Sequence, residues 1–175
     1  MKKDLLDYFK ALMDYYGKYH QHKELSAWAG LVLHILFCTV AIRFALPATS
    51  KLVAFIALVL AVLVVAVLAY LYIRNQLEMK DCGGALAGAA IFFLTEILCA
   101  DEKSLKREKY VTPPQDSAHT RAQAHHVLPK AMLDKAKILN TRGRGFQDRT
   151  RWLIYGLLVV STFAVVGLKI VEAFG

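Results

Sequence analysis

Residues Leu52–Ile73 read LVAFIALVLAVLVVAVLAYLYI, a run of 22 residues that contains no charged side chain. A helix rises about 1.5 Å per residue, so about 20 residues are enough to cross a hydrocarbon core of about 30 Å. A helix of a soluble protein keeps a polar stripe, and this run has none. The run therefore predicts a membrane-spanning helix.

Two further apolar runs lie on either side of it. Leu25–Leu46 is also 22 residues long, and His34 and Arg43 are its only basic side chains. Trp152–Leu168 gives 17 residues, which is at the short end of the range for a membrane span. We therefore predict an all-α integral membrane protein with three transmembrane helices, arranged as a hairpin over residues 25–74 and a third helix in residues 152–175.

Lysine and arginine positions indicate which side of the membrane each segment faces. Five precede Leu25, fourteen lie between Arg74 and Arg151, and the turn between the first two spans has only Lys51. Positively charged loops are retained in the cytoplasm. We expect a multi-pass protein of a cell membrane, such as the bacterial inner membrane, with residues 1–24 and 75–151 in the cytoplasm.

The stretch DCGGALAGAAIFFLTEILCADEK, Asp81–Lys103, raises the question of a fourth crossing. It is rich in alanine and glycine and places Glu96 near one end, where a carboxylate in lipid would need a partner or water. A crossing would also move the twelve Lys and Arg residues of the segment Lys103–Arg151 outward. We predict that it does not cross. It would form a Gly/Ala-rich helix over residues 83–99, which either continues the second span or resumes after a break at Gly83 and Gly84.

Small residues recur along this helix at the spacing of one helical face. Gly84 and Gly88 form a GxxxG pair, and Gly83 with Ala87 repeats the spacing. Such pairs let two helix backbones approach closely. The pattern favours packing on a neighbouring helix, either within the chain or between the subunits of a homo-oligomer. The alternative is that these residues only lower the hydrophobicity of the segment.

Residues 1–24 have the pattern of an amphipathic helix. An apolar stripe recurs every three or four residues, away from Lys10, Asp14 and Lys18; its members are Leu5, Tyr8, Leu12, Tyr15 and Tyr19. Such a helix suits the membrane interface, packing on another helix, or a coiled-coil seam between subunits. We favour packing on another helix near the membrane surface.

The segment from Asp101 to Arg151 carries twelve Lys and Arg against six Asp and Glu. Pro113 and Pro114 predict a loop. Pro129 then opens a short helix, PKAMLDKAKIL, which Asn140 and Thr141 end. One face of this helix would carry Met132, Ala136 and Leu139.

Four arginines precede the third apolar run: Arg142, Arg144, Arg149 and Arg151. Near a membrane surface each such charge contributes roughly 1 kcal/mol of attraction to anionic lipid. Docking of an acidic protein partner is a second use. Binding of nucleic acid is disfavoured because only Phe146 lies among these arginines, whereas nucleic-acid surfaces interleave several aromatic side chains.

The polar side chains of His34, Thr39, Arg43 and Ser161 lie within the predicted spans. A histidine at this depth either bonds a neighbouring helix or lines an ion pathway. In an oligomer the four side chains could line water, which is the basis of a pore as an alternative function.

No metal or cofactor site is indicated. His20 and Glu24 share a helical face, but His22 points away from it, so one metal ion could not collect all three side chains. The motifs of the common enzyme classes are also absent from the sequence.

One short motif has a catalytic counterpart. Arg121 and His126, separated by four residues, resemble the active-site motif of HEPN ribonucleases, a helical family that cleaves RNA. The resemblance implies that His126 would move the proton of the ribose hydroxyl and that Arg121 would neutralise phosphate charge. It covers six residues of the chain.

Taken together, these patterns favour a non-enzymatic membrane protein over an enzyme. It would assemble through small-residue helix faces, as a homo-oligomer, and present a basic cytoplasmic region to anionic lipid or a protein partner. In outline it is similar to small membrane effectors of bacterial defence systems. A pore-forming protein and a membrane-anchored ribonuclease are the alternatives.

Overall fold

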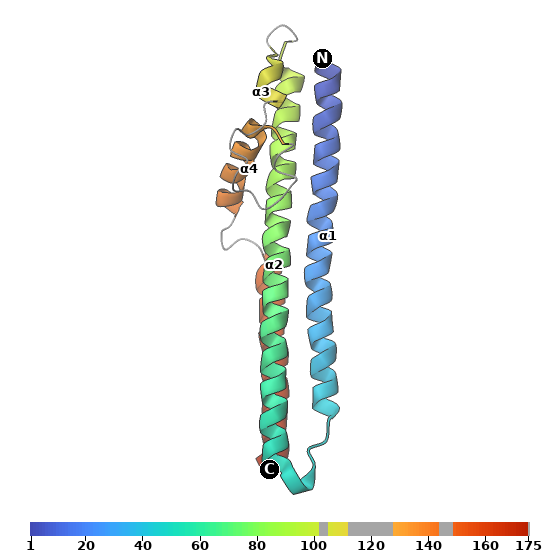
Figure 1. Ribbon diagram of the computed structural model, residues 1–175, viewed down its shortest axis with the longest axis vertical. Helices are drawn as coiled ribbons and strands as arrows, with labels where there is room; N and C mark the ends of the chain where they lie inside the picture. The colour runs from blue at the N-terminus through green and yellow to red at the C-terminus, as the bar shows by residue number, and fades with distance from the viewer. Residues whose placement is uncertain (102–104, 112–127, 144–148, 175) are drawn as a thin grey trace. The chain divides into compact units, whose positions relative to one another are not determined.

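The computed structural model describes residues 1–101, 105–111, 128–143 and 149–174, and within these ranges the chain forms helices and no strand. Figure 1 shows α1 (Lys2–Arg43), α2 (Lys51–Cys99), α3 (Arg107–Val111), α4 (Lys130–Gly143) and α5 (Arg149–Phe174), with a 3-10 turn at Ala48–Ser50 before α2. In the described part of the chain, α1, α2 and α5 are long and apolar enough to cross a membrane. The prediction of an all-α fold with three such helices is confirmed.

Both α1 and α2 extend well beyond the predicted spans. α1 has 42 residues and does not end at Glu24, and α2 has 49 residues. At about 1.5 Å per residue these helices are about 63 and about 74 Å long, roughly twice the thickness of a hydrocarbon core. α2 runs through Gly83 and Gly84 without a break, and no described glycine has a positive φ. Of the two predictions for this segment, continuation of the second helix is the one observed.

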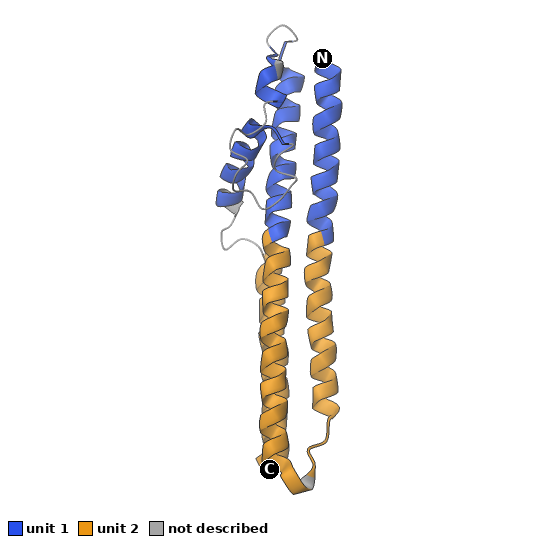
Figure 2. Cartoon of the chain, in the orientation of Figure 1, with its two compact units in different colours: residues 1–22, 79–147 blue, residues 23–78, 148–175 orange. Residues whose placement is uncertain are grey.

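The chain divides into two compact units, each of which takes part of α1 and part of α2 (Figure 2). Unit 1 comprises residues 1–22 and 79–147, and unit 2 comprises residues 23–78 and 148–175.

Unit 2 is a bundle of three helical segments. Contacts pair Gly30 with Tyr72, so α1 and α2 are antiparallel here; the rings of Tyr70 and Tyr155 pair α2 with α5. Its interior is formed by two clusters, Ala27, Leu31, Ile73, Leu77, Ile154 and Leu158, and Cys38, Ala41, Val62 and Val165. The outer surface is apolar as well.

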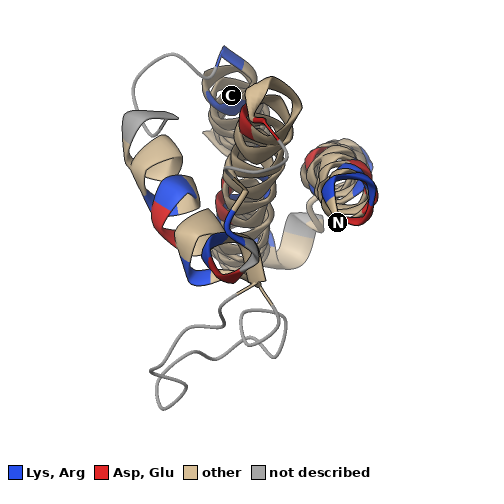
Figure 3. Ribbon diagram, turned by 90° about the horizontal axis from the view of Figure 1, so that it is seen from above, with Lys and Arg blue, Asp and Glu red and all other residues tan. Residues whose placement is uncertain are grey.

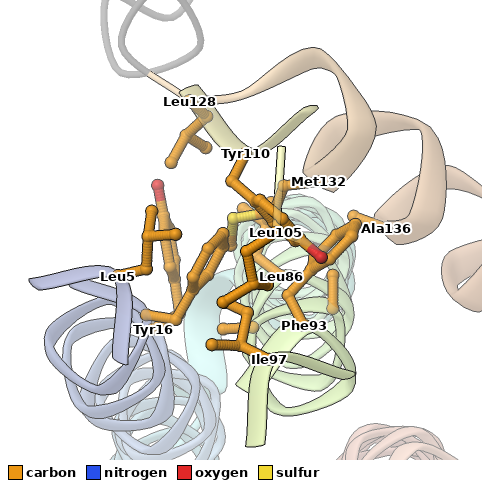
Figure 4. Close-up of a cluster of buried hydrophobic side chains, with 13 residues drawn as sticks. Leu5, Tyr16, Leu86, Phe93, Ile97, Leu105, Tyr110, Leu128, Met132 and Ala136 are labelled. Atoms are coloured by element: carbon orange, nitrogen blue, oxygen red, sulfur yellow. The ribbon is translucent and has the colours of Figure 1, made fainter. Parts of the chain in front are cut away.

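Unit 1 has an aromatic core. The ring of Phe9 in α1 stacks on Phe93 in α2 at 5.5 Å between centroids, and Tyr110 in α3 meets both rings edge-on. In Figure 4 the labelled side chains of this core, among them Tyr16, Phe93, Tyr110 and Met132, converge from α1, α2, α3 and α4. Phe93 and Ile97 are buried, and Met132 and Ala136 of α4 join the same cluster.

Two local details of unit 1 differ from expectation. In residues 2–22 of α1 the buried residues are Leu5, Phe9 and Tyr16, whereas Tyr15 of the predicted stripe is 61% exposed. Tyr15 and Tyr16 lie three and four residues after Leu12, so both fit the spacing of a helical stripe. The surface of α2 that α1 contacts decides which of the two is buried. Helix α4 passes through Thr141 to Gly143, and the Thr141 hydroxyl bonds back to the carbonyls of Lys137 and Ile138 inside the helix.

The small-residue face of α2 packs inside unit 1. A Cβ atom at Gly83 would lie 2.9 Å from Cδ1 of Tyr19, and one at Gly84 would lie 2.9 Å from Nδ1 of His20. A Cβ at Gly88 would lie 3.3 Å from Leu139. Glycine costs a helix about 1 kcal/mol relative to alanine. Here it permits the close approach of α1, so the face contacts neighbours within the same chain.

Replacing Gly83 by leucine should lower the free energy of unfolding by about 1–3 kcal/mol, because the added side chain meets the ring of Tyr19. Gly17→Leu is the matched control, since nothing lies within 4 Å of a Cβ at Gly17. It should raise stability slightly through helix propensity. Denaturant unfolding in mild detergent, followed by circular dichroism, measures both. Equal stability of the two variants would contradict the packing described.

Candidate functional site

A polar cluster lies inside unit 2. His34 on α1 is 2% exposed, and its Nε2 lies 3.0 Å from the Thr162 hydroxyl on α5 and 3.4 Å from the Cys38 thiol. The Thr162 hydroxyl donates its hydrogen to the Leu158 carbonyl at 2.8 Å. Its oxygen is then left as an acceptor, and Nε2 of His34 is the donor. The sequence pointed to His34 but not to its partner Thr162, which is 128 residues away and has no local signal.

Of the other three polar residues singled out in the predicted spans, Ser161 joins this cluster through a side-chain hydrogen bond with Cys38, and Thr39 and Arg43 do not join it. Thr39 is exposed and bonds the Ile35 carbonyl, and Arg43 is exposed near the end of α1. Ser161 is half-buried and bonds the Leu158 carbonyl. Within a single chain, therefore, His34 and Ser161 lie in one buried cluster, whereas Thr39 and Arg43 are exposed.

A second polar cluster joins α5 to the segment that follows α1. Lys169 is 2% exposed, and its Nζ donates to the Phe44 carbonyl at 2.6 Å and to Oε2 of Glu172 at 2.5 Å. Oε1 of Glu172 accepts the Leu46 N–H at 3.0 Å. The pair thus satisfies backbone groups where the helix ends, and the buried lysine has a charged partner. Sequence reasoning did not find it, because Lys169 looked like an isolated charge after the third span.

Basic and aromatic side chains occur together at the start of α5. Arg149 and Trp152 are exposed, Arg151 is half-buried, and Tyr155 lies against Tyr70. Arginine with tryptophan and tyrosine is the composition found where helices leave a bilayer. Arg144 and the side chain of Arg142 lie outside the described residues.

Polar contacts also join the elements of unit 1. Nδ1 of His20 donates to the Lys80 carbonyl at 2.9 Å, beside Gly84. Glu96 accepts hydrogen bonds from Lys109 and from the Tyr110 hydroxyl, which ties α2 to α3. Figure 3 shows further Lys and Arg on α4. The hydrogen bond from Lys109 lowers the pKa of Glu96 below its ordinary value, against the opposing effect of burial.

The remaining sequence candidates gain no support from geometry. Arg121 and His126, the pair similar to a ribonuclease motif, lie outside the described residues. In the described ranges no group of three His, Cys, Asp or Glu side chains is placed to hold a metal ion.

The Glu96 contacts predict an acid-sensitive unit 1. A carboxyl group with a lowered folded-state pKa contributes stability above its unfolded pKa of about 4.3, and this is lost as pH falls through the folded pKa. Between about pH 6 and pH 3 the wild type should therefore lose more thermal stability than Glu96→Gln. Near-ultraviolet circular dichroism of the tyrosines measures this loss.

Glu78→Gln is the control for that measurement, because Glu78 pairs with Arg74 on the exposed surface of the same helix. Its pH dependence should match that of the wild type. If Glu96→Gln lost as much stability in acid as the wild type, the Glu96 contacts would not be the cause.

Comparison with known proteins adds no assignment. No protein-family model matches the chain, and no curated protein or solved structure matches it either.

Proposed function

We propose that the chain is a small, non-enzymatic, multi-pass membrane protein that embeds unit 2 in the bilayer and keeps unit 1 in the cytoplasm. The observation that carries this proposal is the outer surface of unit 2, where aliphatic and aromatic side chains are exposed on all three helices. Val40 is 69% exposed, Val64 58% and Phe163 70%. In water such a surface would be far larger than the apolar patches of soluble proteins. In lipid the exposure of these apolar side chains carries no free-energy penalty.

The continuity of α2 supports a single crossing by this helix. Residues 83–99 prolong the helix that contains Leu52–Ile73 and do not fold back along it. A helix without a break crosses a bilayer once, so its prolongation stays on the side where Ile73 emerges. Three crossings put the N-terminus and residues 79–147 on the cytoplasmic side and the turn near Ser50 on the other.

The basic start of α5 then faces anionic headgroups. Arg149 and Arg151 would each contribute roughly 1 kcal/mol of attraction, and Trp152 and Tyr155 would settle at the same level. A protein partner that carries acidic groups is the other ligand that this charge suits. Both uses fit a protein that organises a membrane surface.

Assembly of several copies is part of the proposal, and α5 offers the surface for it. Gly83, Gly84 and Gly88 pack within the chain and do not offer a surface to another subunit. Gly156 and Gly167 have nothing within 4 Å of a Cβ position. They lie on one exposed stripe of α5 with Val160, Ala164 and Val171. Small residues at such spacing let helices of different subunits approach closely in lipid.

The topology is tested by cysteine labelling. In a variant whose three native cysteines are replaced by alanine, Ser50→Cys should react with a membrane-impermeant maleimide on intact cells, and Lys130→Cys should react only after the cells are opened. Both positions are exposed, so access depends on the side of the membrane. Equal reaction of the two on intact cells would contradict the proposed topology.

The assembly surface is tested by enlarging its glycines. The double variant Gly156→Leu, Gly167→Leu should have a lower mass than the wild type in mild detergent, approaching that of one 19.6 kDa chain. Its fold should be retained, because both positions face open space. Gly17→Leu, an open position of unit 1, should leave the mass unchanged. A wild type that is already monomeric, or a double variant of unchanged mass, would contradict assembly through α5.

A pore is supported less well. It would need several copies to bring Thr39 and Arg43, which are exposed on α1, to a shared water-filled path. His34 is directed at Thr162 of the same chain.

A further inference from the structure

A groove of about 520 Å³ lies between α2 and α5 of unit 2, within the range of about 300–1,000 Å³ that is usual for ligand sites. Its lining is almost entirely apolar, and it includes Leu63 and Val67 from α2 and Val159 and Phe163 from α5. Val67 and Phe163 are 57% and 70% exposed, so the groove is open along the surface of unit 2. In the proposed function that surface faces lipid tails.

The groove has the length of one leaflet of a bilayer. Its lining residues on α2 extend from Val59 to Tyr70, which is about 16–17 Å along the helix. Half of a hydrocarbon core of about 30 Å is about 15 Å, the depth to which the acyl chains of one leaflet reach. The groove therefore matches one acyl chain that lies along its whole length.

Tyrosine and arginine side chains gather at the cytoplasmic end of the groove. Tyr70 lines the groove, and its ring centroid lies 5.3 Å from that of Tyr155 on α5. Arg74 follows Tyr70 by one turn of α2 and is hydrogen-bonded to it. Arg151 precedes Tyr155 by one turn of α5 and interacts electrostatically with it. Each helix thus carries an arginine, then a tyrosine, then the apolar lining along one face.

The charged groups at this end sum to one positive charge. Arg74 and Arg151 are each positive, and Glu78 accepts from Nε of Arg74 at 2.9 Å.

The donors of Arg74 and Tyr70 match a phosphate group. The side chain of Arg74 is 54% exposed, and Nε is only one of the five N–H donors of its guanidinium group. An N–H that donates to the hydroxyl oxygen of Tyr70 leaves that hydroxyl its own hydrogen for another acceptor. Tyr70 is 39% exposed, so this hydrogen is accessible. Phosphate oxygens accept strongly from such a set of donors beside an excess of positive charge.

We propose that the groove binds an anionic phospholipid of the cytoplasmic leaflet, with its phosphate at Arg74 and Tyr70 and one acyl chain along the groove. Arg151 adds attraction to the negative headgroup. The chain exchanges lipid contacts for contacts with the groove, so it gains packing and no hydrophobic free energy. Selection between lipids therefore comes from the charge of the headgroup.

The inference rests on the proposed location of unit 2 in the bilayer, which cysteine labelling tests separately. The full-length protein is purified in mild detergent, stripped of lipid and mixed with equal amounts of phosphatidylglycerol and phosphatidylcholine that carry the same acyl chains. Native mass spectrometry counts the copies of each lipid bound per chain. Phosphatidylglycerol should bind about fivefold more than phosphatidylcholine, which corresponds to roughly 1 kcal/mol for one net charge.

Charge variants test the headgroup contact. Arg74→Gln should bring the two lipids to about equal binding, because the remaining charges at this end cancel. Glu78→Gln should raise the preference by about a further fivefold, because it adds one net positive charge. Arg149→Gln is the control: Arg149 is exposed, but it lies two residues from Arg151 and so points to nearly the opposite side of α5. It should keep the preference of the wild type.

A matched pair of valine variants tests the groove. Val67→Phe fills it without changing a charge, and it should reduce the binding of both lipids. Val64→Phe is the control, because Val64 is 58% exposed on the same helix and does not line the groove. It should bind both lipids as the wild type does. Circular dichroism of each variant confirms that the helices are retained.

Four results would overturn the proposal. Equal binding of the two lipids by the wild type, or an undiminished preference in Arg74→Gln, would mean that this site selects no headgroup. An equal loss of preference in Arg74→Gln and Arg149→Gln would mean general attraction to a basic surface. Val67→Phe that binds as much lipid as Val64→Phe would mean that no acyl chain occupies the groove. In each case the topology found by cysteine labelling would stand, so the proposed function is judged independently.

Discussion

The outer surface of unit 2 imposes the main constraint on this protein, because it has no polar face with which to meet water. Within lipid, every backbone group and every polar side chain has to be satisfied inside the protein. Three described hydroxyl groups of the three segments follow this rule, whereas Oε1 of the buried Gln76 has no hydrogen-bond partner among the described residues. Thr39 and Ser161 return their hydroxyl hydrogens to carbonyls of the preceding helical turn, and Thr162 does so while also accepting from His34. Only Nδ1 of His34 is an exception among the polar atoms of this cluster.

The same constraint explains a lysine that is almost completely buried. Where α1 ends, the carbonyl of Phe44 and the N–H of Leu46 lose their helical partners. Lys169 and Glu172 supply one group to each and neutralise one another. Removal of Glu172 would leave the buried Lys169 without a carboxylate partner, and such an unpaired buried charge is strongly destabilising. The pair therefore joins α5 to the segment that follows α1 at this end of the bundle.

Sequence reasoning predicted the parts of the fold that depend on composition and missed those that depend on tertiary contact. The charge-free run Leu52–Ile73 sufficed to predict a spanning helix, because its length and hydropathy leave few alternatives. The choice of Tyr15 over Tyr16 on α1 failed, since both fit a helical stripe and only the partner surface distinguishes them. The short helix α3 was not predicted: Tyr110 is held there by Phe9 and Phe93, from segments distant in the chain. For the same reason, His34 was noticed but Thr162 was not.

Glycine plays different parts in the two units, and the difference follows from its neighbours. At Gly83 and Gly84 the missing side chain is filled by Tyr19 and His20 of α1, so unit 1 uses the GxxxG-like pattern for its own core. At Gly156 and Gly167 nothing fills the space. A motif of small residues thus indicates that a close approach is sterically possible, but not which helix makes it. In unit 2, Gly30 makes the close approach to Tyr72, so here the missing side chain of a glycine brings α1 and α2 together within the bundle.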